Sequence, residues 1–345
     1  MTAETRSLDL TVSIVTSGRL PLLKRCLRSV VNSLPLQSEI LLVVNGEDRP
    51  TIEWLTNNPL PRLHWEQRRR GSLATHRNFA LSRARGAIFY CLDDDIEVPK
   101  FLFSEVLRFF EQHPDVGLLG GPNRTPPHSS RHQKLFGAVM TSWFAAPWVR
   151  RRYGAGGGES LADFDLMFCN LAFRVSAIPP QLRFVETLRS NEENTFVNSC
   201  AASNVRHRFI DRFYVYHERR TSLVGFLRQI ASYGHGRSQQ VRLGWTWSQF
   251  GFLVPPAVLV LAMVLLATGF VKVLAALVGL HQALGFASVF TGREEIRALG
   301  MGERFKLVPL IGLVHLAYGY GFWWGTLAGF SRLWPQAAIL PIPAR

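Results

Sequence analysis

Three consecutive carboxylates, Asp93, Asp94 and Asp95, directly follow the apolar run Ala87–Leu92. The β-branched and aromatic residues of this run predict a buried strand, bounded upstream by Gly86. Adjacent carboxylates repel one another, and a divalent cation held between Asp93 and Asp95 would neutralise that repulsion. The alternative is an acidic turn without a ligand, because Asp is common in turns. The triplet alone leaves these two interpretations about equal.

The segments around this triplet alternate between strand-like and helix-like patterns. Thr11–Thr16, Glu39–Val44 and the short Leu63–Glu66 are predicted strands, whereas Pro21–Leu34 and Ser72–Arg85 are predicted helices. This alternation predicts a parallel sheet with a nucleotide-type crevice at its strand ends, where ligands of open α/β sheets bind. Neither G-x-G-x-x-G nor G-x-x-x-x-G-K-[ST] follows the first strand, so dinucleotide binding and P-loop phosphate transfer lose their main support.

The composition is basic, with 39 Lys and Arg against 25 Asp and Glu and a net charge of +14. Such a balance suits a nucleic acid, an anionic membrane surface or a phosphorylated substrate, and does not choose between them. The four cysteines form no C-x-x-C pair, which is typical of buried thiols in a reducing compartment. The N-terminus has no signal-peptide pattern, so we expect the first domain to stay in the cytoplasm.

From Phe250 onward the sequence predicts a membrane domain. Three apolar stretches, 250–270, 273–290 and 307–330, are each candidates to cross a bilayer. The middle one is short and contains His281 and Gln282, so whether it truly spans is left open. The expected organisation is a cytoplasmic domain over 1–225, a basic interfacial segment over 226–249, the membrane domain over 250–331 and a tail over 332–345.

Basic residues predict the orientation of these stretches. They precede the first stretch and recur in the loop Thr291–Lys306, so both flanks are expected on the cytoplasmic side. The turn near Gly269–Lys272 would then face outside, and three spans would leave Arg345 outside. The protein is therefore expected in the inner membrane, multi-pass, with its first domain in the cytoplasm. The basic residues before the first stretch are Arg228, Arg237 and Arg242.

Four blocks of the sequence resemble, in order and spacing, the family 2 glycosyltransferases of the GT-A fold. The segments Tyr233–Arg237 and His315–Phe322 are in addition similar to membrane-anchored members that assemble exopolysaccharides of the succinoglycan type. The resemblance implies a GT-A nucleotide-diphospho-sugar transferase domain, with a mixed, mainly parallel sheet flanked by helices, followed by C-terminal transmembrane helices. The four blocks are Val12–Leu27, Ala74–Gly86, Leu92–Asp95 and Arg189–Asn194.

This resemblance implies a nucleotide-sugar donor and a divalent metal, Mg²⁺ or Mn²⁺. Asp93 would lie near the ribose, Asp95 would bind the metal next to the diphosphate, and Asp94 is expected to be the solvated one of the three. Asp93 is also a candidate ligand. His217 would complete the metal site in this fold, although a lone histidine is more often a core residue.

The same resemblance places the catalytic base at Glu193, where the family usually has Asp. The longer side chain leaves Glu192 as a substitute, and the alternative for both is an exposed first helical turn. Donor contacts are implied at Thr16, Asn45, Arg77 and Asn78, with Asp93 and Asp94. Asn45 departs from the usual Asp, and Ser17 and Gly18 depart from an aromatic and Asn, so the nucleotide is not predicted.

Residues before the first apolar stretch are candidates for the acceptor or phosphate side of the site. These are Gln229, Tyr233 and Arg237, which stand where processive synthases have Gln-x-x-Arg-Trp. The absence of that motif favours the addition of a single sugar. The basic run Arg68–Arg70 is expected to be solvated or lipid-facing.

The predicted function is an inverting transfer of one sugar from a nucleotide-diphosphate donor to a lipid-linked, polyprenyl-type, or saccharide acceptor in polysaccharide or glycolipid biosynthesis. The alternative is a degenerate domain that binds a nucleotide or serves as a scaffold without catalysis, which the departures at Asn45 and Glu193 keep open. A membrane-tethered nucleic-acid binder rests on charge alone, so nucleic acid is not an expected partner.

Overall fold

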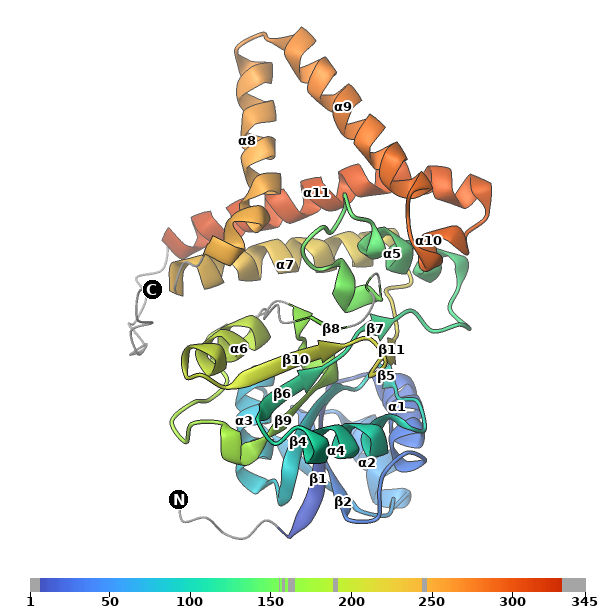
Figure 1. The fold of residues 1–345 in the computed structure, drawn as a ribbon, viewed down its shortest axis with the longest axis vertical. Helices are drawn as coiled ribbons and strands as arrows, with labels where there is room; N and C mark the ends of the chain where they lie inside the picture. The colour runs from blue at the N-terminus through green and yellow to red at the C-terminus, as the bar shows by residue number, and fades with distance from the viewer. Residues whose placement is uncertain are drawn as a thin grey trace. The chain divides into compact units, whose positions relative to one another are not determined.

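The computed structural model describes residues 7–154, 156, 159–160, 165–188, 192–243 and 247–330 (Figure 1). Residues 189–191 of the acidic block, most of the glycine-rich loop Gly154–Gly158 and the tail 332–345 lie outside this part. The chain divides into an N-terminal unit, Met1–Pro126 with Gly157–Glu218, and a C-terminal unit, Pro127–Gly156 with Arg219–Arg345. The C-terminal unit thus includes Pro127–Gly156, which lies within the range 1–225 of the expected soluble domain.

The N-terminal unit is built on an eight-stranded sheet with the order β3-β2-β1-β4-β9-β6-β10-β8. Strands β1 to β4 run parallel, β9 is antiparallel to both of its neighbours, and β10 is parallel to β6. A smaller sheet has the order β5-β11-β7. The strands are β1 Leu8–Thr16, β2 Ser38–Asn45, β3 Leu63–Arg68, β4 Gly86–Asp93, β5 Ile96–Glu97, β6 Val116–Gly120, β7 Asn123–Arg124, β8 Glu159–Ser160, β9 Leu171–Arg174, β10 Arg206–Ile210 and β11 Val215–His217. The predicted α/β fold with a mainly parallel sheet is confirmed.

Helices cover both faces of this sheet. Leu10, Val12 and Ile14 of β1 are buried in one core with α1, α2 and α4, while Phe89 and Cys91 of β4 are buried in a second core with α3 and α6. Alternate residues of a strand point to opposite faces, which is why one apolar strand can serve two cores. These helices are α1 Leu20–Val31, α2 Arg49–Asn57, α3 Leu73–Arg83, α4 Leu102–Gln112 and α6 Glu192–Ala202.

Local signals account for where these elements begin. The Ser72 side chain accepts a hydrogen bond from the Thr75 backbone N–H at 3.1 Å and caps α3, and Asp48 caps α2 in the same way through Thr51. Gly86 opens β4 against β1, where a Cβ would collide with the backbone of Leu10 and Thr11. The parallel register then brings Thr16 of β1 level with Val44 of β2, and Val15 level with Asp93.

The C-terminal unit is helical. Three of its segments, Phe250–Ala267, Val271–Phe290 and Met301–Ala328, are long and apolar enough to cross a membrane. They agree with the three predicted stretches, except that the third helix begins at Met301 rather than near Leu307. The helices of this unit are α5 Arg131–Thr141, α7 Leu223–Leu243, α8 Val254–Ala267, α9 Val271–Phe290, α10 Glu294–Arg297 and α11 Met301–Phe330.

Candidate metal and donor site

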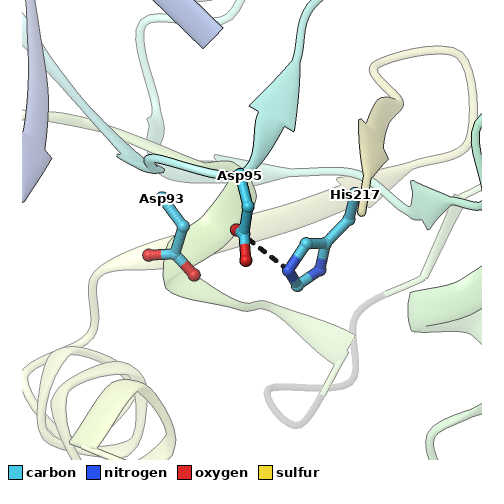
Figure 2. A group of neighbouring side chains, drawn as sticks. All are labelled: Asp93, Asp95 and His217. Carbon is cyan, nitrogen blue, oxygen red and sulfur yellow. Dashed lines mark ion pairs between the residues drawn. The ribbon is translucent and has the colours of Figure 1, made fainter. Parts of the chain in front are cut away.

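Asp93, Asp95 and His217 form a compact cluster in the N-terminal unit (Figure 2). Each offers one ligand atom, and these atoms lie within 4.8 Å of one another. Asp93 ends β4 and Asp95 follows it in a turn, whereas His217 ends β11, which pairs antiparallel with β5 so that His217 lies opposite Ile96. The small second sheet therefore brings the histidine to the aspartates. The three residues expected as metal ligands therefore lie together, and their role as ligands stays a prediction.

Two carboxylate oxygens and one imidazole nitrogen are donors that suit Mg²⁺ or Mn²⁺. In the structure, His217 Nε2 lies 3.2 Å from Asp95 Oδ1, and both side chains are mostly buried. Burial lowers the pKa of His217, but the charge of Asp95 outweighs it and raises the pKa to about 10. The protonated imidazole therefore neutralises Asp95 at neutral pH, and a metal ion would have to displace that proton.

The expectation that Asp94 is the solvated residue of the triplet is wrong. Asp94 is fully buried, accepts a hydrogen bond from Thr16 Oγ1 at 2.7 Å and forms an ion pair with Arg19. Burial raises the pKa of Asp94 to about 6, although Arg19 and Thr16 both act to lower it. The middle carboxylate points into the protein, where Thr16 at the end of β1 donates a hydrogen bond to it.

Arg19 is a site residue that the sequence analysis missed. Its Nη1 donates to Asp95 Oδ2 at 2.7 Å, and its other nitrogens contact Asp94, so one guanidinium bridges two carboxylates of the triplet. Burial lowers its pKa, but the three aspartates outweigh this and raise it. Its position just after β1, at the edge where Asp93 ends β4, was the available signal.

Arg77 links Asp93 to the acidic start of α6. Its Nη2 donates to Asp93 Oδ1 at 2.8 Å and its Nη1 to Glu192 Oε1 at 2.9 Å, while its guanidinium lies over the Phe168 ring at 4.6 Å. Burial lowers the pKa of Arg77, but the charges of Asp93 and Glu192 outweigh burial, so the pKa is raised overall. Arg77, Glu192 and Asp93 are therefore brought together.

Glu193 stands beside Glu192 in the first turn of α6 and is half-buried. The carboxylate of Glu192 is the one hydrogen-bonded to Arg77, and the charge of Glu193 also acts to raise the pKa of Arg77. Glu192 is thus a buried carboxylate held by an ion pair with Arg77. The alternative of two exposed helix-start acids does not describe Glu192, which is 6 % exposed.

The two asparagines among the expected donor contacts hold neighbouring loops. Asn45 donates from Nδ2 to the Gly71 carbonyl at 3.1 Å and accepts from the Gly71 N–H at 3.0 Å. Asn78 accepts from the Phe184 N–H at 2.9 Å and donates to Glu186 at 2.8 Å. Asn78 thereby fixes the loop before α6.

A cavity of about 870 Å³ lies at the carboxyl ends of the first three strands. The basic run Arg68–Arg70 lines it, so these arginines, expected to be merely solvated or lipid-facing, belong to the wall of a pocket. Asn45 lines the same cavity. The other lining residues are Ser17, Gly18, Gly46, Glu47, Asp48, Pro50 and Gln67.

The three residues expected on the acceptor side lie on α7 in the C-terminal unit. Arg237 is buried, donates to Gln240 Oε1 at 2.7 Å and lies 3.9 Å over the ring of Phe252. Tyr233 packs against the apolar core of this unit, and Gln229 is half-buried. Arg237 is thus held by contacts within its own unit.

Comparison with known families decides the class of the N-terminal unit. Residues 11–171 match the model of glycosyl transferase family 2. These residues are similar to family 2 glycosyltransferases. The predicted class of enzyme, a glycosyltransferase, is confirmed by this match. No curated protein is similar enough in sequence to count as a match.

Solved structures resemble the glycosyltransferase at the level of the fold. A mannosyltransferase from Pyrobaculum calidifontis, PcManGT, in complex with GDP-Man and Mn²⁺, is 16% identical, with a TM-score of 0.61 over 93% of this chain and 88% of that one. S. aureus TarS 1–349 is also 16% identical, with a TM-score of 0.47 over 94% of this chain and 92% of that one. The first likeness confirms the GT-A fold.

Proposed function

We propose that the protein is a membrane-anchored, inverting glycosyltransferase that moves one sugar from a nucleotide-diphosphate donor to a lipid-linked or saccharide acceptor. One observation carries this proposal: a cluster that could hold a metal lies at the end of β4, and Arg77 connects it to Glu192. The cluster consists of Asp93, Asp95 and His217. The family match and the fold shared with a GDP-mannose-binding enzyme support it.

The residues of the site divide the work of the transfer. Cleavage of the bond between sugar and diphosphate leaves negative charge on the phosphates, which a divalent ion held by Asp95, Asp93 and His217 would neutralise as a Lewis acid. Arg19, next to Asp95, adds a further positive charge at the same place. The cavity lined by Asn45 and Arg68–Arg70 would hold the nucleoside.

We assign the catalytic base to Glu193. Glu192 is held by Arg77 at 2.9 Å, so one of its oxygens is committed to that ion pair. Glu193, one residue along, would take the proton from the acceptor hydroxyl as that oxygen attacks the anomeric carbon. Attack opposite the leaving diphosphate in a single step inverts the anomeric configuration.

The location proposed for this chemistry is the cytoplasmic face of the inner membrane. Apolar helices that could cross a bilayer support membrane attachment, and the basic residues at their flanks support the orientation. Basic side chains near a membrane surface would also suit a polyprenyl phosphate carrier. We therefore prefer a lipid-linked acceptor, used in polysaccharide or glycolipid synthesis, over a free saccharide. Gln229, Tyr233 and Arg237 remain our candidates for the acceptor side.

The test is release of nucleoside diphosphate by membranes that contain the protein, incubated with a panel of nucleotide sugars and Mg²⁺ or Mn²⁺. We expect one donor to be consumed only when an acceptor is added, and a chelator to stop the release. Asp95→Asn should abolish it, whereas Asp115→Asn, which changes an exposed carboxylate paired with Arg206, should not. Transfer that survives Asp95→Asn would contradict the proposal, and nuclear magnetic resonance of the product tests inversion.

A further inference from the structure

The two helices α8 and α9 form a hairpin whose far half is exposed on nearly every side. Its large apolar side chains are exposed from Val258 through Leu280, and the turn between the helices lies at Gly269. Contiguous apolar surface of this extent needs a non-aqueous partner. At 1.5 Å per residue, α9 with its 20 residues is about 30 Å long, which matches the hydrocarbon thickness of a bilayer.

Helix α11 contacts this hairpin at the start of α8 and in the second half of α9. Trp323 Nε1 donates to the Pro256 carbonyl at 2.9 Å, and a Cβ at Gly319 would lie 3.2 Å from the Pro255 carbonyl oxygen, both in the first turn of α8. On the other side, His315 Nδ1 lies 3.0 Å from His281 Nε2 in the second half of α9. Helix α11 thus contacts α8 near its start and α9 in its second half, while the turn between the two helices stays exposed. The axis of α11 therefore crosses the hairpin and does not run along it.

Helix α7 lies along α11. Gly321 and Gly234 allow this close approach, since a Cβ at Gly321 would collide with the Ala231 backbone and one at Gly234 with the Tyr318 carbonyl. Farther along, Arg242 Nη2 donates to the Gly325 carbonyl at 3.0 Å. The two helices are therefore side by side over their C-terminal halves, and Figure 1 shows α11 between α7 and the hairpin.

The pair formed by α7 and α11 is polar on one side and apolar on the other. The outward stripe of α7 consists of exposed or half-exposed polar residues, and the exposed stripe of α11 consists of apolar and aromatic ones. Both stripes follow the helical repeat of three to four residues. The α7 stripe is Arg228, Ser232, His235, Gln239 and Arg242, and the α11 stripe is Phe305, Pro309, Leu313, Leu316, Tyr320, Trp324 and Leu327.

We propose that α11 lies in the plane of the membrane interface and does not cross the bilayer, whereas the α8–α9 hairpin enters it. The apolar stripe of α11 contacts lipid, and α7 keeps its arginines at the headgroup level. A crossing α11 would carry the parallel α7 into the hydrocarbon, and with it Arg228, Arg237 and Arg242. Its 30 residues, about 45 Å, also exceed the thickness that it would have to span. This inference rests on the proposed membrane attachment and revises the expectation of three spans.

Depth measurements on the full chain in liposomes test the inference. Spin labels would be attached to single cysteines at exposed positions of α11, namely Phe305, Leu313, Tyr320 and Leu327, and at matched hairpin positions, namely Val258, Leu266, Val273 and Leu280. The four native cysteines are buried, which keeps background labelling low. Collision with oxygen and with a water-soluble nickel chelate then reports the depth of each label.

We expect the α11 labels to lie at one shallow depth, within about one helical pitch, ~5 Å, while the hairpin labels descend toward the tip. A depth that changes steadily along α11 by about 30 Å would overturn the inference. Topology gives a second readout: cysteines at Gly300 and Arg345 should react with an impermeant maleimide from the same side, and opposite sides would overturn it. Hairpin labels that all stay in water would refute membrane attachment itself.

Discussion

The Arg77 guanidinium donates to Glu192 Oε1 at 2.9 Å, and both side chains are more than nine-tenths buried. This contact joins α3 to the first turn of α6, which are 115 residues apart in the sequence. The second hydrogen bond of Arg77, to Asp93, extends the link to the end of β4. The arginine thus holds the segment with the proposed base at the strand end with the proposed metal ligands.

Replacing Arg77 should therefore cost stability as well as activity. Arg77→Leu leaves the buried Glu192 without its partner, and removing one member of a buried ion pair costs about 3–5 kcal/mol. Chemical denaturation of the detergent-solubilised protein measures this loss. Arg108→Leu is the matched control, because its pair with Glu105 lies on the surface, and it should change the free energy of unfolding by less than about 1 kcal/mol. Equal effects of the two changes would contradict the assigned role of Arg77.

Replacing Glu193 should mainly lower kcat, whereas replacing Glu192 should mainly lower stability. Glu193→Gln removes the proposed base, and we expect kcat to fall by roughly 10²- to 10⁴-fold while KM for the donor changes little. Glu192→Gln should mainly lower the melting temperature, because it weakens the pair with Arg77. Initial rates and thermal unfolding of both variants test this, and a kcat loss larger in Glu192→Gln than in Glu193→Gln would exchange the roles.

Metal binding should depend on residues from both sheets of the N-terminal unit, since Asp95 follows β4 of the large sheet and His217 ends β11 of the small one. Asp95→Asn and His217→Ala each remove one of three ligands, and we expect the affinity for Mn²⁺ to fall by at least about tenfold, or ~1.4 kcal/mol. Electron paramagnetic resonance of free Mn²⁺ during titration measures it without reference to turnover. Unchanged Mn²⁺ binding in His217→Ala would show that β11 contributes no ligand. Glu66→Gln, at an exposed position of β3, serves as the control.

Arg19 should oppose metal binding in the absence of donor. The Arg19 guanidinium lies 2.7 Å from the Asp95 carboxylate, so it would compete with a metal ion for that carboxylate. Arg19 is 37% exposed, so the Coulombic effect is screened, and Arg19→Ala should tighten Mn²⁺ binding by only about fivefold, ~1 kcal/mol. The same variant should bind the donor less tightly, as seen in a raised KM. Weaker Mn²⁺ binding in Arg19→Ala would mean that the arginine helps to shape the site instead.

The thiols should be inert in the folded protein. All four cysteines are buried, and burial raises the pKa of Cys91 and of Cys200 to about 12. At pH 8 these two are therefore thiols and not thiolates, and they should not react with iodoacetamide within hours. Mass spectrometry counts the modified cysteines, and the same treatment in guanidinium chloride should modify all four. Rapid modification of Cys91 in the native protein would contradict the packing of β4.

Much of the N-terminal unit follows from local patterns. The strands β1, β2, β3 and β4 and the helices α1 and α3 are all predicted within a few residues, because alternation, apolar runs and caps are read over short windows. The grouping of Asp95 with His217 was expected from a family resemblance. Composition could not have shown it, because a single histidine carries no spacing signal.

The directions of side chains could not be predicted in the same way. Asp94 was expected in solvent, yet it is buried because Thr16 and Arg19 receive it at the end of the neighbouring strand. The sequence predicts a solvated or lipid-facing run at Arg68–Arg70, yet these arginines line a cavity that forms only when β3 pairs with β2. Both features depend on how separate strands align, which a window of adjacent residues does not contain.

The pairing of β11 with β5 has a consequence for the order of events during synthesis. Asp93 and Asp95 leave the ribosome more than a hundred residues before His217, the residue that completes their cluster. The sequence that follows is α7 and then the apolar hairpin. The cation site therefore closes only as the membrane segments begin to emerge, and contacts of such long sequence separation form late in folding. A chain released early would hold the aspartates without the histidine, so under the proposed membrane attachment a complete cluster marks a chain whose apolar helices are about to follow.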